Sequence, residues 1–274
     1  MQNLAEIILN PDGSIYHLHL KPEEIADVII TVGDQGRVDR VAAFFDQIKI
    51  IRQHREFRTV TGIYRKKAMT VISTGIGTDN VDIVLNELDI LANVLLPERI
   101  AHPFPKSLII CRMGTSGAIR PEIPVGTLLV SAEAWGVDGL HSGYDFGELT
   151  QVREGVFAYR ADSDTELLDL FVREGFMKGN TLTTSGFYGP QGRSVRIPTL
   201  FDWMRTGGGF ISEKNLANLE METAGIYALS NLLGHRPVSL NAILANRITG
   251  EFSTNPDGVM EEVIRRGLEV LSRI

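Results

Sequence analysis

The chain has 274 residues, 43% of them hydrophobic and 22% charged, an ordinary globular composition that allows one large α/β domain or two small ones. Its net charge of −7 argues against a general nucleic-acid binder, which needs a basic face. No apolar run approaches the roughly 20 residues that span a bilayer, and the N-terminus lacks a signal-peptide pattern, so we expect a cytoplasmic protein that binds neither nucleic acid nor membrane.

The first quarter of the chain alternates strand and helix patterns. The β-branched run at 26–34 predicts a buried strand, and the apolar spacing over 36–46 predicts a helix with Phe45 on its buried face. Residues 48–75 predict two or three strands with a turn at Gly62.

A second strand–helix pattern follows. Residues 78–95 predict a helix whose N-cap is Thr78 or Asp79. Residues 107–117 predict a strand that ends in a glycine loop, Gly-Thr-Ser-Gly. The chain's one cysteine, Cys111, lies in this apolar run, so we expect a buried, inert thiol and a reducing compartment.

The second half continues the alternation, and a turn is expected at Gly207 to Gly209. Strands are predicted at 126–139 and 237–250, and helices at 162–176, 221–234 and 255–274. Alternating strands and helices predict a mixed or largely parallel sheet covered on both faces. No linker divides the chain, so we expect one α/β domain over residues 1–274.

Unusual residues stand where several predicted strands end, and ligands bind beyond the carboxyl ends of strands in open α/β sheets. Gly33 and Arg37 follow the first strand, and Arg112 and Thr115 lie near the end of the strand at 107–117. Taken singly these are also ordinary turn glycines and solvated residues, and "GDQGR" has neither P-loop nor dinucleotide spacing. Together with Arg55, they favour a site for a small anion.

The stretch "TSGFYGPQGR" combines flat rings with flat polar groups. It holds Phe187, Tyr188, Gln191 and Arg193 within a few residues. A glutamine amide donates and accepts, whereas a guanidinium only donates. The pattern is typical of a loop that binds a flat polar molecule.

Six motifs make the chain resemble the nucleoside phosphorylase family, and within it the uridine phosphorylases. They are "GDQGRVDRVA", "HREF", "STGIGTDNVDIVLNEL", "RMGTSGAI", "GFYGPQGR" and "NLEMETAGIYAL". The resemblance covers nearly the whole chain and implies a mixed, partly barrel-like sheet flanked by helices. It implies reversible phosphorolysis of uridine to uracil and ribose 1-phosphate, with phosphate as co-substrate and no required cofactor.

The resemblance also assigns roles to residues. Phosphate contacts would come from Gly33, Arg37, Arg112 and Thr115, with Arg55 supplied by a neighbouring subunit. Ribose contacts would come from Glu220, Met221 and Glu222, with His17 reaching the partner's sugar. The base would be held by Phe187, Gln191 and Arg193, and the chemistry would depend most on Arg112, Arg193 and Glu222. Shared sites require a homodimer at least, and the family implies a homohexamer.

One motif departs from the family pattern. Bacterial relatives hold a potassium ion at the dimer contact, and the resemblance places Glu56, Ile76 and Asn80 there. Asn80 stands where those enzymes carry a serine ligand, so the structural cation is left open.

The residue types at the expected base site favour uracil. Uracil presents an acceptor, a donor and an acceptor, which Gln191 and Arg193 can match together, whereas cytosine presents a donor to the arginine. Purine phosphorolysis is helped by an acid that protonates the base, but Asn246 and Arg247 occupy the loop where related enzymes carry an aspartate. Asp138 and Asp145 are the alternative acids should the base be a purine.

Three alternatives to uridine phosphorolysis stay open. They are a purine nucleoside phosphorylase, a nucleosidase of the same fold that uses water, and a non-catalytic nucleoside-binding protein. A nucleosidase has no use for three phosphate-binding arginines, and neither has a binding protein.

Overall fold

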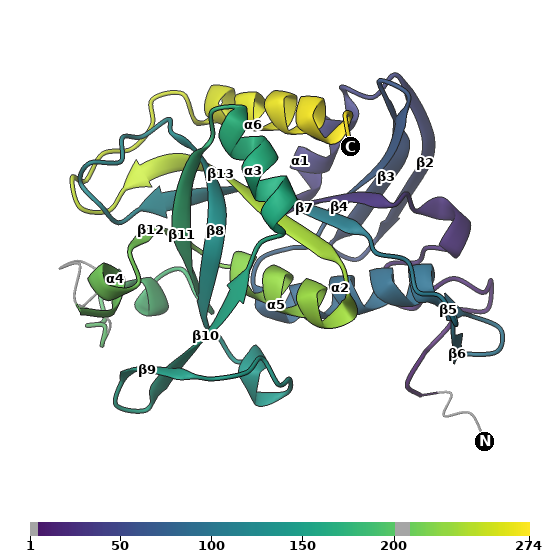
Figure 1. Ribbon diagram of the computed structural model, residues 1–274, viewed down its shortest axis with the longest axis horizontal. Helices are drawn as coiled ribbons and strands as arrows, with labels where there is room; N and C mark the ends of the chain where they lie inside the picture. Colours follow the sequence, from purple (N-terminus) through teal and green to yellow (C-terminus); the bar gives the residue numbers. More distant parts are fainter. Residues whose placement is uncertain (1–4, 201–208) are drawn as a thin grey trace.

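A mixed β-sheet runs through the chain, and α-helices lie on both of its faces (Figure 1). The computed structural model describes residues 5–200 and 209–274, so Gly207 and Gly208 of the expected turn lie outside the described residues. The sheet strands are β1 (Val28–Val32), β2 (Gln47–His54), β3 (Phe57–Tyr64), β4 (Lys67–Ser73), β7 (Ile109–Ala118), β8 (Leu128–Val137), β9 (Thr150–Arg153), β10 (Val156–Asp162), β11 (Met177–Thr184), β12 (Leu216–Glu220) and β13 (Arg236–Asn246). The α-helices are α1 (Gln35–Ala42), α2 (Thr78–Asn93), α3 (Thr165–Arg173), α4 (Gly209–Glu213), α5 (Thr223–Leu233) and α6 (Pro256–Leu271).

Five of the strands close into a ring. Strand β7 pairs with β12, β12 with β11, β11 with β8, β8 with β13, and β13 again with β7. Three of these pairings are parallel and two are antiparallel. The prediction of a mixed, partly barrel-like sheet is therefore confirmed.

Two open extensions leave this ring. Strand β1 pairs in parallel with β7 and with β4, and β3 and β2 follow as antiparallel neighbours. Strands β10 and β9 continue from β8 on the other side. Because β1, β7 and β13 run parallel, their carboxyl ends meet at one edge of the sheet, where three of the loops singled out in the sequence begin.

Two hydrophobic cores lie on opposite faces of the sheet. Helices α1, α3 and α6 bury their apolar residues on one face, and α2 and α5 bury theirs on the other (Figure 1). Cys111 is fully buried in the first core, where burial raises the pKa of its thiol far above the ordinary value, so the expectation of a buried cysteine is confirmed. The helices packed on both faces hold the strands in place, and with them the sheet edge where the loops meet.

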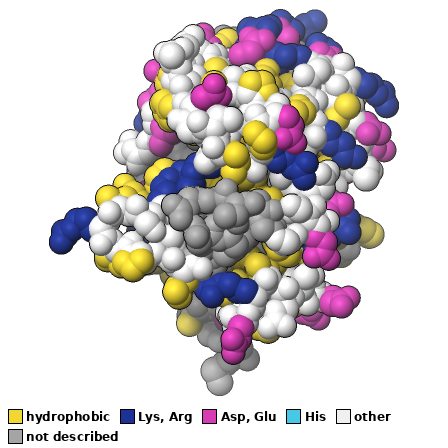
Figure 2. Space-filling view, turned by 90° about the vertical axis from the view of Figure 1, so that its left-hand side faces the viewer, with side chains coloured by type: hydrophobic (Ala, Val, Ile, Leu, Met, Phe, Trp, Pro, Cys, Tyr) yellow, Lys and Arg dark blue, Asp and Glu magenta, His cyan; other side chains and the backbone are white. Residues whose placement is uncertain are grey.

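The surface shown in Figure 2 carries mixed charge. Basic and acidic side chains alternate across it, and hydrophobic side chains lie between them. No helix in the described ranges is long and apolar enough to cross a bilayer.

The prediction of a turn at Gly62 is wrong. Gly62 lies inside β3 rather than in a turn, because the turns fall at Arg55–Glu56 and Arg65–Lys66. A Cβ at Gly62 would lie 2.5 Å from both the Gln47 carbonyl oxygen and the Phe45 ring, so glycine permits close packing of β2 on β3.

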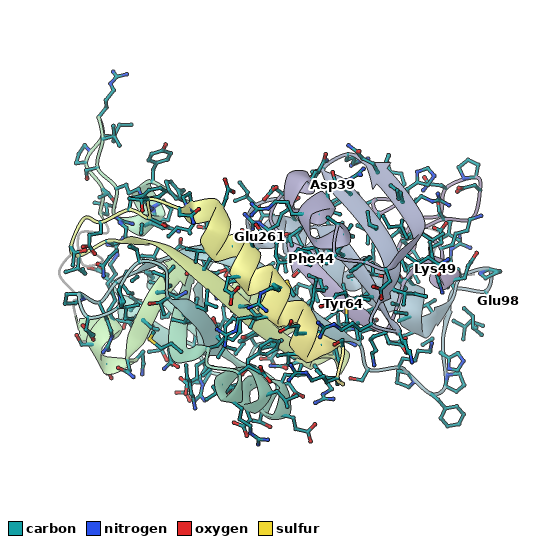
Figure 3. All side chains as sticks on the ribbon, turned by 90° about the horizontal axis from the view of Figure 1, so that it is seen from above. Asp39, Phe44, Lys49, Tyr64, Glu98 and Glu261 are labelled. Atoms are coloured by element: carbon teal, nitrogen blue, oxygen red, sulfur yellow. The ribbon has the colours of Figure 1, made fainter. Side chains whose placement is uncertain are left out.

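Helix α1 ends before the predicted boundary, at Ala42. Phe44 and Phe45, just beyond it, still pack into the core that holds Tyr64 of β3, and Figure 3 shows Phe44 and Tyr64 near each other beside α6. The apolar residues that predicted a longer helix therefore lie in a turn that packs on the core.

The predictions for the α2 N-cap and for the end of β7 are also wrong. The N-cap of α2 is Gly77, at φ 94°, rather than Thr78 or Asp79. The Gly-Thr-Ser-Gly run continues as strand within β7 because its backbone pairs with β13 throughout.

Candidate active site

A cavity of about 640 Å³ opens where β1, β7, β12 and β13 end. Its lining comes from these strands and from the segment between β11 and α4. The cavity brings together ten of the residues predicted for the site: Gly33, Arg37, Arg112, Thr115, Phe187, Gln191, Arg193, Glu220, Met221 and Glu222. Segments far apart in the sequence therefore meet around one space of the size that holds a small molecule.

Arg37 lies at one end of the cavity, in the first turn of α1. The Asp34 side chain caps this helix by accepting from the Arg37 N–H at 2.8 Å, and it also pairs with the Arg37 guanidinium at 3.1 Å. The Nε atom of Arg37 is buried and has no hydrogen-bond partner among the described residues. Burial lowers the pKa of Arg37, and the nearby charge of Arg112 lowers it further. An incompletely compensated guanidinium of this kind favours an anion.

Arg112 lies on β7 with only 7% of its surface exposed. One terminal nitrogen donates to Glu222 at 2.7 Å and lies 3.0 Å from Glu220, and the other donates to the Asn241 side chain at 3.1 Å. Burial alone lowers the pKa of Arg112, but the two carboxylates outweigh it, so the pKa is raised. A Cβ at Gly114 would lie 2.1 Å from this guanidinium, so glycine is needed for Arg112 to lie flat across β7.

The two glutamates after β12 are held in different ways. Glu220 accepts from the Thr183 hydroxyl at 2.5 Å and from the N–H groups of Glu222 and Thr223, so it caps α5. Glu222 accepts from the Gly77 N–H at 2.8 Å. Burial raises the pKa of Glu222 although Arg112 opposes the shift. Glu222 is therefore a well-oriented carboxylate, and Glu220 supports both the helix and Arg112.

Gln191 and Arg193 lie at the other end of the cavity. Gln191 is 2% exposed, and its carbonyl oxygen accepts from Arg193, which also donates to the Phe187 carbonyl at 2.6 Å. Burial lowers the pKa of Arg193 to about 10, and the charge of Arg247 adds to this shift. The contact with Arg193 fixes which end of the glutamine amide is the acceptor. The amide NH₂ donates to the Glu220 carbonyl at 3.5 Å, so the two side chains bring together an amide donor, an amide acceptor and a guanidinium donor.

Phe187 packs on Arg193, with the guanidinium carbon 3.6 Å from the ring centroid. The ring was predicted to pack on the base, and it remains 50% exposed beside the cavity. The arginine therefore occupies one ring face, and the exposed part remains for another flat group.

The end of β13 and the loop after it add residues that the sequence analysis did not assign to the site. They are Leu244, Ala245, Glu251 and Phe252, together with Ser116 and Gly117 of β7. The sequence signal was the stretch "LANRITGEF", which carries Asn246 and Arg247, but nothing in its composition shows which of its side chains face inward.

Asn246 holds this loop rather than offering a polar group to a ligand. Its NH₂ donates to the carbonyls of Arg120 and Ile123, and its oxygen accepts from Ile248 and Thr249. All of its main hydrogen-bonding positions are thereby filled. An asparagine at this position shapes the loop, and it supplies no proton to a base.

The alternative acids for a purine lie elsewhere. Asp138 is buried against the Tyr159 hydroxyl at 2.7 Å, and burial raises its pKa. Asp145 accepts from the Gly147 N–H. Within the described ranges, neither aspartate lines the cavity.

The residues expected to act on a neighbouring subunit lie outside the cavity. His17 pairs with Glu87 at 2.6 Å, and Arg55, at φ 55°, stacks on the Tyr16 ring. The two segments therefore lie side by side through Tyr16 and His17, whose rings are 4.8 Å apart. Neither His17 nor Arg55 is among the residues that line the cavity of the same chain.

The residues of the expected cation site are close to one another. A Cβ at Gly75 would lie 2.5 Å from the Asn80 amide nitrogen and 3.5 Å from Glu56, and Ile76 is 69% exposed. The described part of the chain holds no cluster of three or more His, Cys, Asp or Glu residues suited to a metal ion. A potassium ion bound here would depend on carbonyl and amide oxygens, and its presence stays a prediction.

Comparison with known proteins agrees with this geometry. Residues 27–274 match the model of the phosphorylase superfamily. A uridine phosphorylase of Thermococcus kodakarensis is 31% identical over 252 residues, covering 90% of this chain and 83% of that protein. A guanosine phosphorylase of Halorubrum lacusprofundi is 26% identical over 94% of this chain and 95% of its own.

A solved structure shares the fold over the full chain. The nucleoside phosphorylase of Trypanosoma brucei, described as showing uridine phosphorylase activity, superimposes with a TM-score of 0.84 at 28% identity. The match covers 98% of this chain and 100% of that one. The paired arginines, the buried glutamates and these matches lead to one conclusion: the chain belongs to the phosphorylase superfamily and is a nucleoside phosphorylase.

Proposed function

We propose that this enzyme catalyses the reversible phosphorolysis of uridine to uracil and ribose 1-phosphate, in cytoplasmic pyrimidine salvage. The observation that carries the choice of base is the row of donor, acceptor and donor formed by Gln191 and Arg193. Uracil offers the complementary row along O2, N3–H and O4. Cytosine would place its amino group against a donor, an unpaired contact that costs roughly 1–3 kcal/mol.

In this mechanism Arg37 and Arg112 bind phosphate below the sugar. A phosphate oxygen attacks C1′ of the ribose as the bond from C1′ to N1 of uracil breaks. The base leaves with negative charge on its ring oxygens, is stabilised by the Arg193 guanidinium, and takes up a proton to become uracil. Holding the reactants in line is most of the catalysis, because no covalent enzyme intermediate is formed.

Glu222 would bind the ribose hydroxyls. Its carboxylate is oriented by Arg112 and by the Gly77 N–H, and burial strengthens its contacts. Thr115, Met221 and Gly33 line the same part of the cavity and complete the phosphate and ribose contacts.

The assembly is part of the proposal. Because His17 and Arg55 lie outside their own cavity, each site would take them from a neighbouring subunit, which makes a homodimer the minimum unit. A homohexamer built from such dimers is the expected assembly. Phosphate is the co-substrate, and the only other group proposed is a structural potassium ion held near Glu56 and Asn80.

The test is release of free base from a panel of nucleosides, with and without phosphate. We expect uracil from uridine only when phosphate is present, and at least tenfold lower activity with cytidine, adenosine, inosine and guanosine. Undiminished release without phosphate would identify a nucleosidase instead.

A second candidate is a phosphorylase that prefers purine nucleosides. It is favoured by the matching guanosine phosphorylase and by Glu251, a carboxylate that lines the cavity beside the loop after β13. Preferred cleavage of guanosine or inosine, abolished by Glu251→Gln, would establish this candidate and contradict the reading of Gln191 and Arg193.

A further inference from the structure

A glutamate outside the cavity, Glu87 in the middle of α2, holds the segment that carries His17. Its side chain is 9% exposed. Its two oxygens accept from the His17 N–H at 3.0 and 3.1 Å, from the Leu18 N–H at 2.8 Å, and from Nδ1 of the His17 ring at 2.6 Å. An ionised carboxylate only accepts, so Nδ1 carries a proton. In the neutral ring, Nε2 is then left as a hydrogen-bond acceptor.

The rest of the His17 residue is also fixed. Its carbonyl oxygen accepts from Nδ1 of His54 at 2.8 Å, and its ring meets the edge of the Tyr16 ring. The side chain is 29% exposed, and Nε2 has no hydrogen-bond partner among the residues that the structure describes. Nε2 is therefore the one polar atom of this partly exposed ring that is left without a partner.

Arg55 lies on the same surface. Its guanidinium carbon is 5.3 Å from the Tyr16 ring centroid, and a terminal nitrogen lies 3.5 Å from the Tyr16 hydroxyl. Tyr16 thus joins the histidine to an arginine that lies far from it in sequence. Both would reach the same neighbouring site as one unit.

We propose that Glu87 is a positioning residue for sugar binding. It fixes the tautomer and the direction of His17, so that Nε2 accepts a hydrogen bond from a hydroxyl of the sugar held by a second copy of this chain. The inference rests on the proposed function, in which His17 contacts the partner's ribose. A glutamate that only anchored this segment would need to accept only from the two backbone N–H groups. The additional contact with Nδ1 of His17 is the one that orients the ring.

Glu87→Gln tests the tautomer directly. The amide has a single oxygen, which must serve the two N–H groups of the backbone because these cannot turn away. Its NH₂ group then faces Nδ1 of His17, which has to become an acceptor. Long-range ¹H–¹⁵N spectra of histidine-labelled protein should show Nδ1–H in the wild type and Nε2–H in the variant, without any substrate. A wild-type ring protonated at Nε2 alone would overturn the proposal.

A double-mutant cycle tests whether Glu87 acts through His17. We expect Glu87→Gln to lower kcat/KM for uridine about three- to tenfold, mainly through KM, which corresponds to one weakened hydrogen bond. In a His17→Ala background the same change should cost less than twofold. An equal loss in both backgrounds, or no loss in either, would contradict the proposal.

Analogues of uridine that lack one hydroxyl identify the contact. The 2′-, 3′- and 5′-deoxy compounds should include one whose cleavage is insensitive to Glu87→Gln, because the hydrogen bond is already gone. If Glu87→Gln lowers the cleavage of all three analogues as much as that of uridine, His17 does not bind a sugar hydroxyl. A wild type that cleaves no uridine at all would instead refute the proposed function, and the tautomer measurement would still stand.

Asp89→Asn is the matched control. Asp89 lies on the same helix and also faces a histidine, His235, with 3.3 Å between the carboxylate oxygen and Nε2. This pair lies away from His17 and from the cavity. The control should leave uridine kinetics within twofold of the wild type and should leave the His17 spectrum unchanged, whereas a parallel effect of both variants would mark a general loosening of α2.

Discussion

Gly114→Ala should disable the enzyme by moving a neighbouring side chain. The new Cβ would lie 2.1 Å from the nearest guanidinium nitrogen of Arg112, whereas ordinary contact begins near 3.4 Å. The guanidinium must therefore move by more than ~1 Å, which would break its bonds to Glu222 and Glu220, now 2.7 and 3.0 Å long. The methyl group itself touches no substrate.

The size of the effect follows from these contacts. A misplacement of about 1 Å at a reacting centre can cost on the order of 10²-fold in rate. Loss of one charge-assisted hydrogen bond costs roughly 1.5–3 kcal/mol, and each kcal/mol lowers the Tm of a domain of this size by about 2–4 °C. We expect at least a hundredfold loss of kcat/KM for phosphate and a Tm lowered by several degrees.

The assay is steady-state phosphorolysis with phosphate varied at saturating uridine, together with thermal unfolding. Gly139→Ala makes the same chemical change where the new Cβ meets no atom within 4 Å, and it should leave both measurements near the wild type. A Gly114→Ala enzyme with near-normal phosphate kinetics would refute the argument that Arg112 must lie flat on β7.

Three further predictions concern the cavity and its assembly. Gln191→Ala should raise KM for uridine. Arg193→Ala should lower kcat more than it raises KM, because the contact of Arg193 with the base strengthens as charge builds on the leaving base. Similar effects on kcat and KM in both variants would contradict this difference. Burial raises the pKa of Glu222 above its ordinary 4.5, so the fold loses stability as pH rises from 4.5 toward the raised pKa. Glu222→Gln should therefore gain stability relative to the wild type as pH rises above 4.5 in urea unfolding, and a constant difference would refute the sign. Mixed oligomers of Arg55→Ala and Arg112→Ala subunits should recover part of the activity, because one kind of shared site then contains neither substitution. If mixed oligomers form and stay inactive, each site is built within one chain.

Much of the fold is visible in the sequence because buried strands and amphipathic helices leave strong periodic signals. The run that became β1 and the helix closed by Gly234 are of this kind, and Gly234 is left-handed as its position at the helix end requires. Strand β12 escaped prediction because all of its residues are buried, including Asn218 and Glu220, so no alternation marks it. A glycine alone was also a poor guide, since Gly62 serves close strand packing rather than a turn.

The site was predicted residue by residue, but its internal connections were not. Sequence motifs placed Arg112 and Glu222 in one site, and no motif shows that they pair with each other when the cavity is empty. Contacts of this kind depend on side-chain directions that arise only when strands from separate segments meet. The same is true of Glu87, whose helical spacing resembles that of any surface glutamate, although it is buried beneath the N-terminal segment.

The contacts of Glu220 make one part of the cavity harder to alter by substitution than the rest. The Glu220 carboxylate accepts from the N–H groups at the start of α5 and from Thr183, and it pairs with Arg112, so the part of the cavity proposed to bind phosphate is built into the framework of the protein. The part proposed to bind the base depends instead on a short loop around Gln191 and on the loop after β13. Substitutions in these two loops could therefore change the preferred nucleobase while the residues proposed to bind phosphate stay the same. Directed evolution of a new base preference should begin in these loops.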